Sequence, residues 1–61
     1  MTMPSPADIR AARLSLGLTQ AQAGAMVGAT RRTWQNWELG TRRMPKGMWE
    51  LWTMKTKGVM K

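Results

Sequence analysis

The chain of 61 residues contains no cysteine and no histidine, and its acidic side chains number only three. Without cysteine there is no disulfide and no thiolate nucleophile, so a reducing cytoplasm is the compartment we expect. The usual structural zinc sites need cysteine or histidine, so we expect no metal and no cofactor. The chain also offers no acid–base pair and no nucleophile with an activating neighbour, which argues against an enzyme.

Long apolar runs are absent too. None approaches the ~20 residues that span a bilayer, and the first residues, MTMPSPAD, lack the basic and apolar regions of a secretory signal. We therefore expect one domain over residues 1–61, with no membrane partner. A chain of this size buries only about 60% of its unfolded surface. Four tryptophans help to form its core, since each aromatic side chain buries roughly 150–250 Å².

Positive charge, in contrast, is abundant and unevenly placed. The net charge is +7, from ten basic and three acidic side chains. Residues 1–30 hold two arginines and one aspartate, a net charge of +1, whereas residues 31–61 hold eight basic and two acidic side chains, a net charge of +6. Such asymmetry indicates a polyanionic partner, although a basic protein without one would show the same composition.

Capping residues and helical periodicity predict four helices and no strand. The predicted helices cover residues 6–16, 20–26, 31–39 and 46–56. The first three each follow a side chain that can cap a helix, namely Ser5, Thr19 and Thr30. Residues 1–4 and 58–61 are expected to be flexible ends.

Two residues fit these predicted helices poorly. Arg13 lies on the apolar face formed by Ile9, Ala12 and Leu16, and a buried arginine needs a partner. Gly24 lies inside a short helix, where glycine costs about 1 kcal/mol relative to alanine. We therefore expect another backbone or a large ring to pack against Gly24.

Small and polar residues recur at a particular spacing between positions 17 and 40. Gly-Leu-Thr-Gln at 17–20 is followed by Gly24 and Gly28, then by Thr30, Thr33 and Trp-Glu-Leu-Gly at 37–40. This pattern resembles the helix-turn-helix of the Cro/C1-type (XRE) repressor family, and the resemblance covers residues 7–45. It implies an all-α, four-helix, lambda-repressor-like domain, in which a short fifth turn can follow, with the motif at about residues 20–39.

The resemblance also implies roles for individual positions. The residues that would read DNA bases are Arg31, Arg32, Gln35 and Asn36. Those that would contact phosphates are Gln20, Thr30, Thr33, Arg42, Arg43 and Lys46. Some members of the family have a buried ion pair at the positions of Arg13 and Glu38, which would give Arg13 the partner that it needs.

The periodicity of residues 31–39 agrees with the base-reading role. At 100° per residue, Trp34 and Trp37 share one side of the helix, and the four predicted base-reading residues lie largely on the other. Arginine can bond bidentately to guanine, and asparagine or glutamine to adenine. A merely solvated polar face would show the same pattern.

Small residues stand at positions where relatives usually have large ones. Ala23 and Ala29 replace larger aliphatic residues, whereas Trp34 and Trp37 stand where isoleucine is common. Cores tolerate substitution when their total volume is kept. We therefore expect Trp34 or Trp37 to fill the space above Ala23, Gly24 and Ala29.

The leading hypothesis is a sequence-specific DNA-binding regulator, specifically a dimeric repressor of its own operon in a bacterium, phage or plasmid. The resembling family also includes antitoxins and anti-CRISPR-associated regulators. The expected partners are a pseudo-palindromic operator and a second copy of the chain, with no small-molecule ligand. Little sequence follows the fourth helix, so we expect Trp49 and Trp52 as dimer contacts, the alternative being a wholly intramolecular core.

Two other hypotheses use the carboxyl-terminal part of the chain. One is an antitoxin-like or other protein-interaction module, in which the Trp- and Met-rich helix 46–56 contacts a partner. The other is a basic amphipathic membrane binder formed by residues 46–61. The membrane hypothesis conflicts with the need for the tryptophans of this segment to cover a small core.

Overall fold

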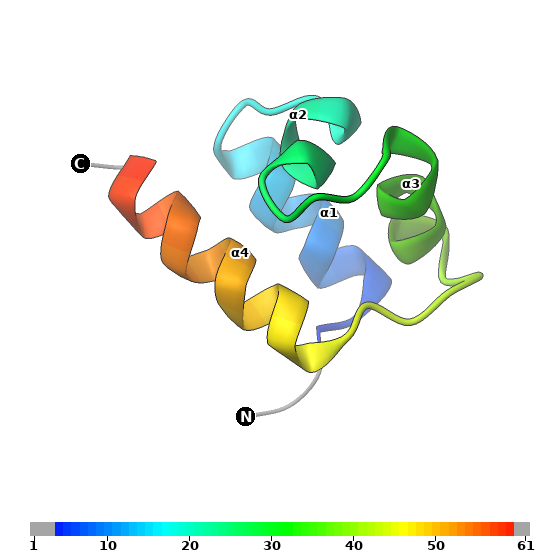
Figure 1. The fold of residues 1–61 in the computed structure, drawn as a ribbon. Coiled ribbons are helices and arrows are strands. Elements are labelled where there is room, and N and C mark those ends of the chain that lie inside the picture. The colour runs from blue at the N-terminus through cyan, green and yellow to red at the C-terminus, as the bar shows by residue number, and fades with distance from the viewer. Residues whose placement is uncertain (1–3, 60–61) are drawn as a thin grey trace.

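Four helices joined by short turns make up the computed structural model, which describes residues 4–59 and the side chains of residues 4–57 (Figure 1). The helices are α1 (Pro6–Ser15), α2 (Gln20–Ala25), α3 (Arg31–Leu39) and α4 (Lys46–Val59). No strand occurs within residues 4–59. Of the expected flexible ends at 1–4 and 58–61, residues 1–3 and 60–61 lie outside the described residues.

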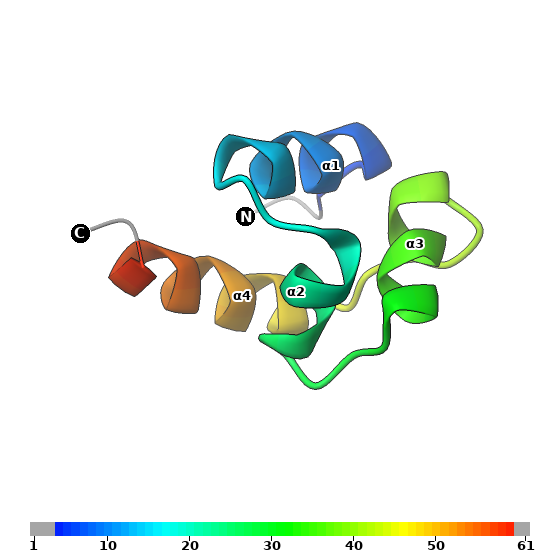
Figure 2. The same ribbon diagram turned by 90° about the horizontal axis from the view of Figure 1, so that it is seen from above.

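The helices surround a small interior, with α3 at one end. Seen from above, α1 lies apart from α2 and α4, and the carboxyl end of α4 points away from α3 (Figure 2). None of the described helices is long and apolar enough to cross a membrane.

The predicted caps are confirmed at three helix starts. Ser5 accepts a hydrogen bond from the backbone of Asp8, whose carboxylate accepts one from the backbone of Ser5. Thr19 and Gln22 make the same reciprocal pair at the start of α2. Thr30 accepts from the backbone N–H of Thr33 at the start of α3. Each cap satisfies a donor that a helix start leaves without a partner.

The expected end of the fourth helix at Thr56 is wrong, because α4 continues through Gly58 to Val59. A glycine inside a helix costs about 1 kcal/mol. That penalty does not end a helix whose preceding turns are packed on a core. The second helix is slightly shorter than predicted and ends at Ala25.

Tryptophan makes up half of the buried apolar residues. The buried apolar residues are Ile9, Ala23, Trp34, Trp37, Met44 and Trp52. The Trp34 ring meets that of Trp37 edge-on at a centroid distance of 5.5 Å and that of Trp52 at 5.3 Å. The Trp49 ring stacks on Trp52 at 5.7 Å. Such ring pairs add about 0.5–1.5 kcal/mol each beyond the area that they bury.

The prediction of Trp52 as a dimer contact is wrong. Its side chain is 1% exposed, and its indole Nε1 donates a 3.1 Å hydrogen bond to the carbonyl oxygen of Ala23. The dense apolar run 48–54 has several members that could face inward, so periodicity alone did not identify Trp52 as the buried one. Trp49 is half-buried, whereas Leu51 and Met54 are exposed.

Backbone, not a ring, approaches Gly24. A Cβ atom there would lie 2.9 Å from the carbonyl oxygen of Ala29 and 3.1 Å from that of Thr30. The expectation that another backbone or a large ring packs against Gly24 is confirmed for backbone. The placement of Trp34 or Trp37 above Ala23, Gly24 and Ala29 stays a prediction. Glycine allows α2 to approach the segment that leads into α3, so the geometry of the two motif helices depends on it.

A second contact fixes α4 to the end of α2. The ammonium of Lys55 donates a 2.7 Å hydrogen bond to the carbonyl oxygen of Met26, which caps α2. Together with the bond from Trp52, it connects α4 to two carbonyls of the predicted motif. The Ala23 carbonyl also accepts from the backbone N–H of Met26, whereas the Met26 carbonyl lies past the last turn of α2, where carbonyls have no partner within the helix.

Candidate nucleic-acid interface

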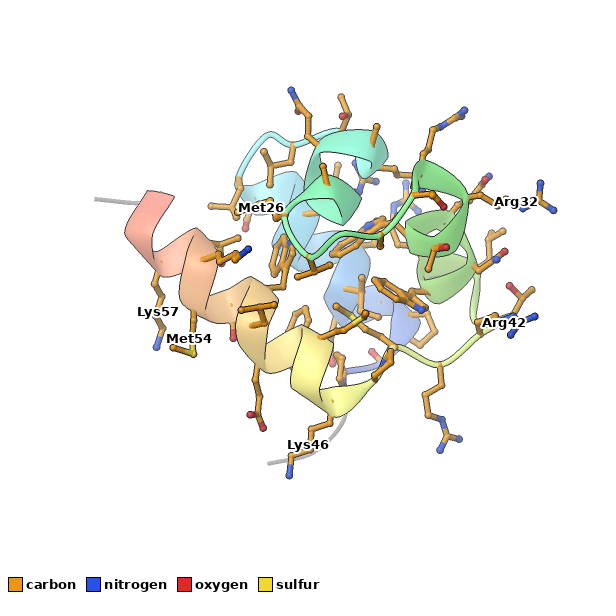
Figure 3. The ribbon with its side chains drawn as sticks, in the orientation of Figure 1. Met26, Arg32, Arg42, Lys46, Met54 and Lys57 are labelled. Carbon is orange, nitrogen blue, oxygen red and sulfur yellow. The ribbon has the colours of Figure 1, made fainter. Side chains whose placement is uncertain are left out.

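The outer side of α3 presents two arginines to solvent. Arg31 and Arg32 are exposed, whereas Trp34 and Trp37 on the inner side are buried. Figure 3 shows Arg32 and Arg42 projecting from the same side of the molecule, away from α4. Within the described residues, neither Arg31 nor Arg32 takes part in an ion pair. Both guanidinium groups can therefore bond an external acceptor without breaking an internal ion pair.

The other two predicted base-reading residues are half-buried. The Asn36 side-chain oxygen accepts a 3.2 Å hydrogen bond from the Thr41 hydroxyl, and the Asn36 backbone carbonyl accepts one of 3.1 Å from the Thr41 N–H. The same carbonyl accepts from the N–H of Gly40, whose φ of 80° ends α3. Asn36 thus holds the turn after α3, a role that sequence reasoning missed. Its carboxamide nitrogen is a donor that these bonds do not use.

The predicted partner of Arg13 is present. Its Nε and Nη2 atoms donate to the two carboxylate oxygens of Glu38 at 2.6 and 3.1 Å, and Nη1 donates to the Leu18 carbonyl at 3.0 Å. The two side chains are only 13% and 5% exposed. A bidentate pair of this kind is among the stronger charge-assisted contacts in proteins, and it joins α1 to α3.

Two further donors meet the same carboxylate. The Gln20 carboxamide donates to Glu38 at 3.2 Å, and the Trp34 indole N–H donates to its other oxygen. Glu38 therefore connects α1, α2 and α3. Sequence reasoning foresaw neither bond. The bond from Gln20 depends on how α2 and α3 cross, whereas Trp34 and Glu38 are four residues apart within α3. Gln20, predicted only as a phosphate contact, also has this internal role.

The pKa of Glu38 reflects these opposing influences. Burial on its own raises the pKa of the carboxyl group. The hydrogen bonds from Arg13, Trp34 and Gln20, together with the charge of Arg13, lower it more, so that the pKa lies below its ordinary value. Glu38 is consequently ionised at neutral pH, and its negative charge compensates the positive charge of Arg13.

Three basic residues follow α3 in the turn and at the start of α4. Arg42, Arg43 and Lys46 are all exposed. The two arginines border a hollow of about 220 Å³ with Ile9, Trp37 and Met44 in its wall. The predicted phosphate contacts of this segment are thus accessible and lie beside α3.

The two threonines at the start of α3 bond to each other. The hydroxyl groups of Thr30 and Thr33 lie 3.0 Å apart, and Thr30 also caps the helix. Thr30 is exposed and Thr33 is half-buried. Both hydroxyls lie at the same end of α3 as Arg31 and Arg32, where a phosphate contact was predicted.

Comparison with protein-family models supports what the fold indicates. Residues 9–47 match the helix-turn-helix family model, and this match covers more than half of the chain. The chain therefore belongs to the Cro/C1-type (XRE) helix-turn-helix family, whose domains bind DNA and are not enzymes. The predicted all-α, lambda-repressor-like fold is confirmed. A search of curated proteins found no match.

Proposed function

We propose that this DNA-binding domain is a sequence-specific transcriptional regulator that represses its own operon, in a bacterial, phage or plasmid setting, as a dimer on a pseudo-palindromic operator. One observation carries the proposal. Arg31 and Arg32 are exposed at the amino end of α3, while the buried Trp34 and Trp37 on the inner side and the ion pair of Glu38 with Arg13 hold that helix in place. A helix held in this way can enter the major groove with its amino-terminal residues at base edges.

The contacts divide into two kinds. Arg31 and Arg32 bond to base edges, where a bidentate arginine–guanine pair discriminates by about 1–3 kcal/mol. Gln35 and the carboxamide nitrogen of Asn36, both of which belong to half-buried residues, add further base contacts. The residues proposed to contact phosphates are Gln20, Thr30, Thr33, Arg42, Arg43 and Lys46.

Footprinting on the DNA upstream of the chain's own gene tests the proposal. Protection of two half-sites with related, inverted sequences is the expected result, with centres about one helical turn or a multiple of it apart. Uniform protection without sequence preference would contradict specific regulation. Binding that requires a second protein would favour an interaction module instead.

We expect Arg32→Ala and Lys46→Ala to weaken DNA binding in different ways. Loss of Arg32 should weaken binding to the operator by about 1–3 kcal/mol and relax the preference at one base pair. Loss of Lys46 should weaken all sequences about equally, since a phosphate contact carries no sequence information directly. Competition binding against a panel of single-base operator variants measures both effects. A changed base preference in Lys46→Ala would contradict its assignment to phosphate.

We expect a dimer because one recognition helix reads only a few base pairs of DNA. Two half-sites double the number of base pairs that are read. With Trp52 in the core, the apolar surface of the described α4 side chains comes from half-buried Met48 and Trp49 and from Leu51 and Met54, which are 43% and 70% exposed. Sedimentation equilibrium at micromolar concentration, with and without operator, should show a dimer in at least one state; a monomer in both contradicts it.

The same exposed residues support a second candidate function. Leu51 and the outward-pointing Met54 (Figure 3) could instead contact a different protein, as in an antitoxin. A protein that binds its operator without any other protein present would argue for the first function.

A further inference from the structure

A second hollow lies on another flank of α3. It measures about 200 Å³ and is lined by Arg10, Arg13, Gln20, Gln35, Glu38 and Leu39. Gln35 in its wall and Trp37 in the wall of the first hollow are two residues apart, which places them about 200° apart around the helix. The two hollows therefore lie on opposite flanks of α3.

The charges in this hollow leave a positive rim. The carboxylate of Glu38 is neutralised by Arg13, whose guanidinium it holds in two hydrogen bonds. Arg10, one turn earlier on α1, is exposed and takes part in no ion pair among the described residues. The carboxylate of Asp8, two residues before Arg10, accepts a hydrogen bond from the backbone N–H of Ser5 in the helix cap. An anion that entered the hollow would meet the Arg10 guanidinium and the carboxamide of Gln20, which is itself a proposed phosphate contact.

The width of DNA's major groove indicates which ligand this hollow meets when α3 lies in the groove. The groove is about 12 Å wide, and a helix with its side chains is about 10–12 Å in diameter. A recognition helix in the groove therefore has a phosphate backbone along both flanks. Arg42 and Arg43 lie along one flank of α3. Along the other flank, Arg10 is the basic side chain of the hollow that has no ion-pair partner among the described residues.

We propose that Arg10 is a phosphate contact from α1, made in this second hollow, so that α3 is held in the groove by cations on both flanks. The proposal rests on the proposed function, because it requires α3 to lie in the major groove. Arg10 touches no base in this arrangement, so its contribution is the same for every sequence.

The salt dependence of DNA binding tests the proposal. Fluorescence anisotropy with a labelled operator duplex is measured between 50 and 200 mM salt for the wild type, Arg10→Gln, Arg10→Lys and Lys57→Gln. Neutralising one phosphate contributes about −0.9 to the slope of log Kobs against log salt. We expect Arg10→Gln to have a slope smaller by about this amount, and Arg10→Lys to keep most of it, because lysine retains the charge. Lys57, exposed on α4 and pointing away from Arg32 and Arg42 (Figure 3), is the matched control and should leave the slope unchanged.

The outcomes separate this inference from the function on which it rests. A wild-type slope in Arg10→Gln, with operator binding retained, overturns the role of Arg10 alone. An equal loss of slope in Lys57→Gln also overturns it, since the effect would then reflect overall charge. A wild-type protein that does not bind the operator contradicts the proposed function itself. Thermal unfolding monitored by circular dichroism verifies that each variant is folded.

Discussion

Replacing Glu38 with glutamine is expected to lower the free energy of unfolding by about 3–5 kcal/mol, because it leaves the buried charge of Arg13 without a partner. The carboxylate is 5% exposed and accepts bonds from Arg13, Gln20 and Trp34. The free energy of unfolding of a native domain is only about 5–15 kcal/mol, so this loss is a large fraction of the total. Urea unfolding followed by tryptophan fluorescence measures the loss.

Two controls distinguish the loss of this buried hydrogen-bond network from the loss of any one carboxylate. Glu50→Gln removes an exposed carboxylate and should change stability by no more than about 0.5 kcal/mol. The double variant Arg13→Met/Glu38→Leu removes both charges, and well-packed apolar replacements of buried ion pairs are often neutral or stabilising. It should therefore recover much of the loss. A Glu38→Gln variant as stable as Glu50→Gln would contradict the role of Glu38.

The same carboxylate predicts how stability depends on pH. The pKa of Glu38 in the folded domain lies below its ordinary value, so ionised Glu38 favours folding. This contribution is complete above the ordinary glutamate pKa of about 4.3 and is lost as the pH falls through the lower, folded value. Unfolding free energies measured from pH 7 down to pH 3 should fall more steeply in the wild type than in Glu38→Gln. Parallel curves would be inconsistent with the shift.

Replacing Gly24 with alanine is expected to destabilise the domain by about 1–3 kcal/mol, the usual cost of overpacking. Helix propensity alone predicts the opposite sign, a gain of about 1 kcal/mol. The clash prevails because the new Cβ would meet the carbonyl oxygens of Ala29 and Thr30 at 2.9 and 3.1 Å. Backbone atoms cannot rotate away as a side chain can. Since these residues lead directly into α3, the shift also moves Arg31 relative to α2, and operator affinity should fall.

Gly47 provides the matched control for this prediction. It lies in the first turn of α4, where an added Cβ would have no atom within 4 Å from the described residues other than its chain neighbours and the backbone of its own helix. Gly47→Ala should therefore stabilise the domain by about 0.4–1 kcal/mol, because alanine restricts the unfolded chain. The free energies of unfolding of Gly24→Ala and Gly47→Ala, measured by chemical unfolding, test these two opposite signs. If Gly24→Ala were also stabilising, the close approach of α2 to the start of α3 would be wrong.

Features that depend on local sequence could be predicted well. Ser5, Thr19 and Thr30 each cap a helix through bonds to residues three positions away, and such contacts are encoded within one turn. The inward positions of Trp34 and Trp37 follow likewise from the helical period. The spacing of the glycines and threonines indicated the family.

Features that depend on how helices meet could not be predicted in this way. Trp52 was misassigned because the choice of which residue of an apolar run faces inward depends on the position of its acceptor, the carbonyl of Ala23, 29 residues away. The bond from Lys55 to Met26 spans the same separation. Gly24 was expected to meet another backbone or a large ring, and the nearest atoms are backbone; which segment supplies them depends on how α2 meets the start of α3.

The role of Asn36 in holding the turn after α3 has a consequence for how such a domain diverges. Substitutions at Arg31 or Arg32 alter exposed groups that form no ion pair with any described residue, so a change of target sequence there need not disturb the fold. A substitution at Asn36 also removes the side-chain oxygen that accepts from the Thr41 hydroxyl, which is one of the bonds that hold the segment leading to Arg42. Retargeting by single mutations is therefore biased toward the base pairs that face the amino end of α3.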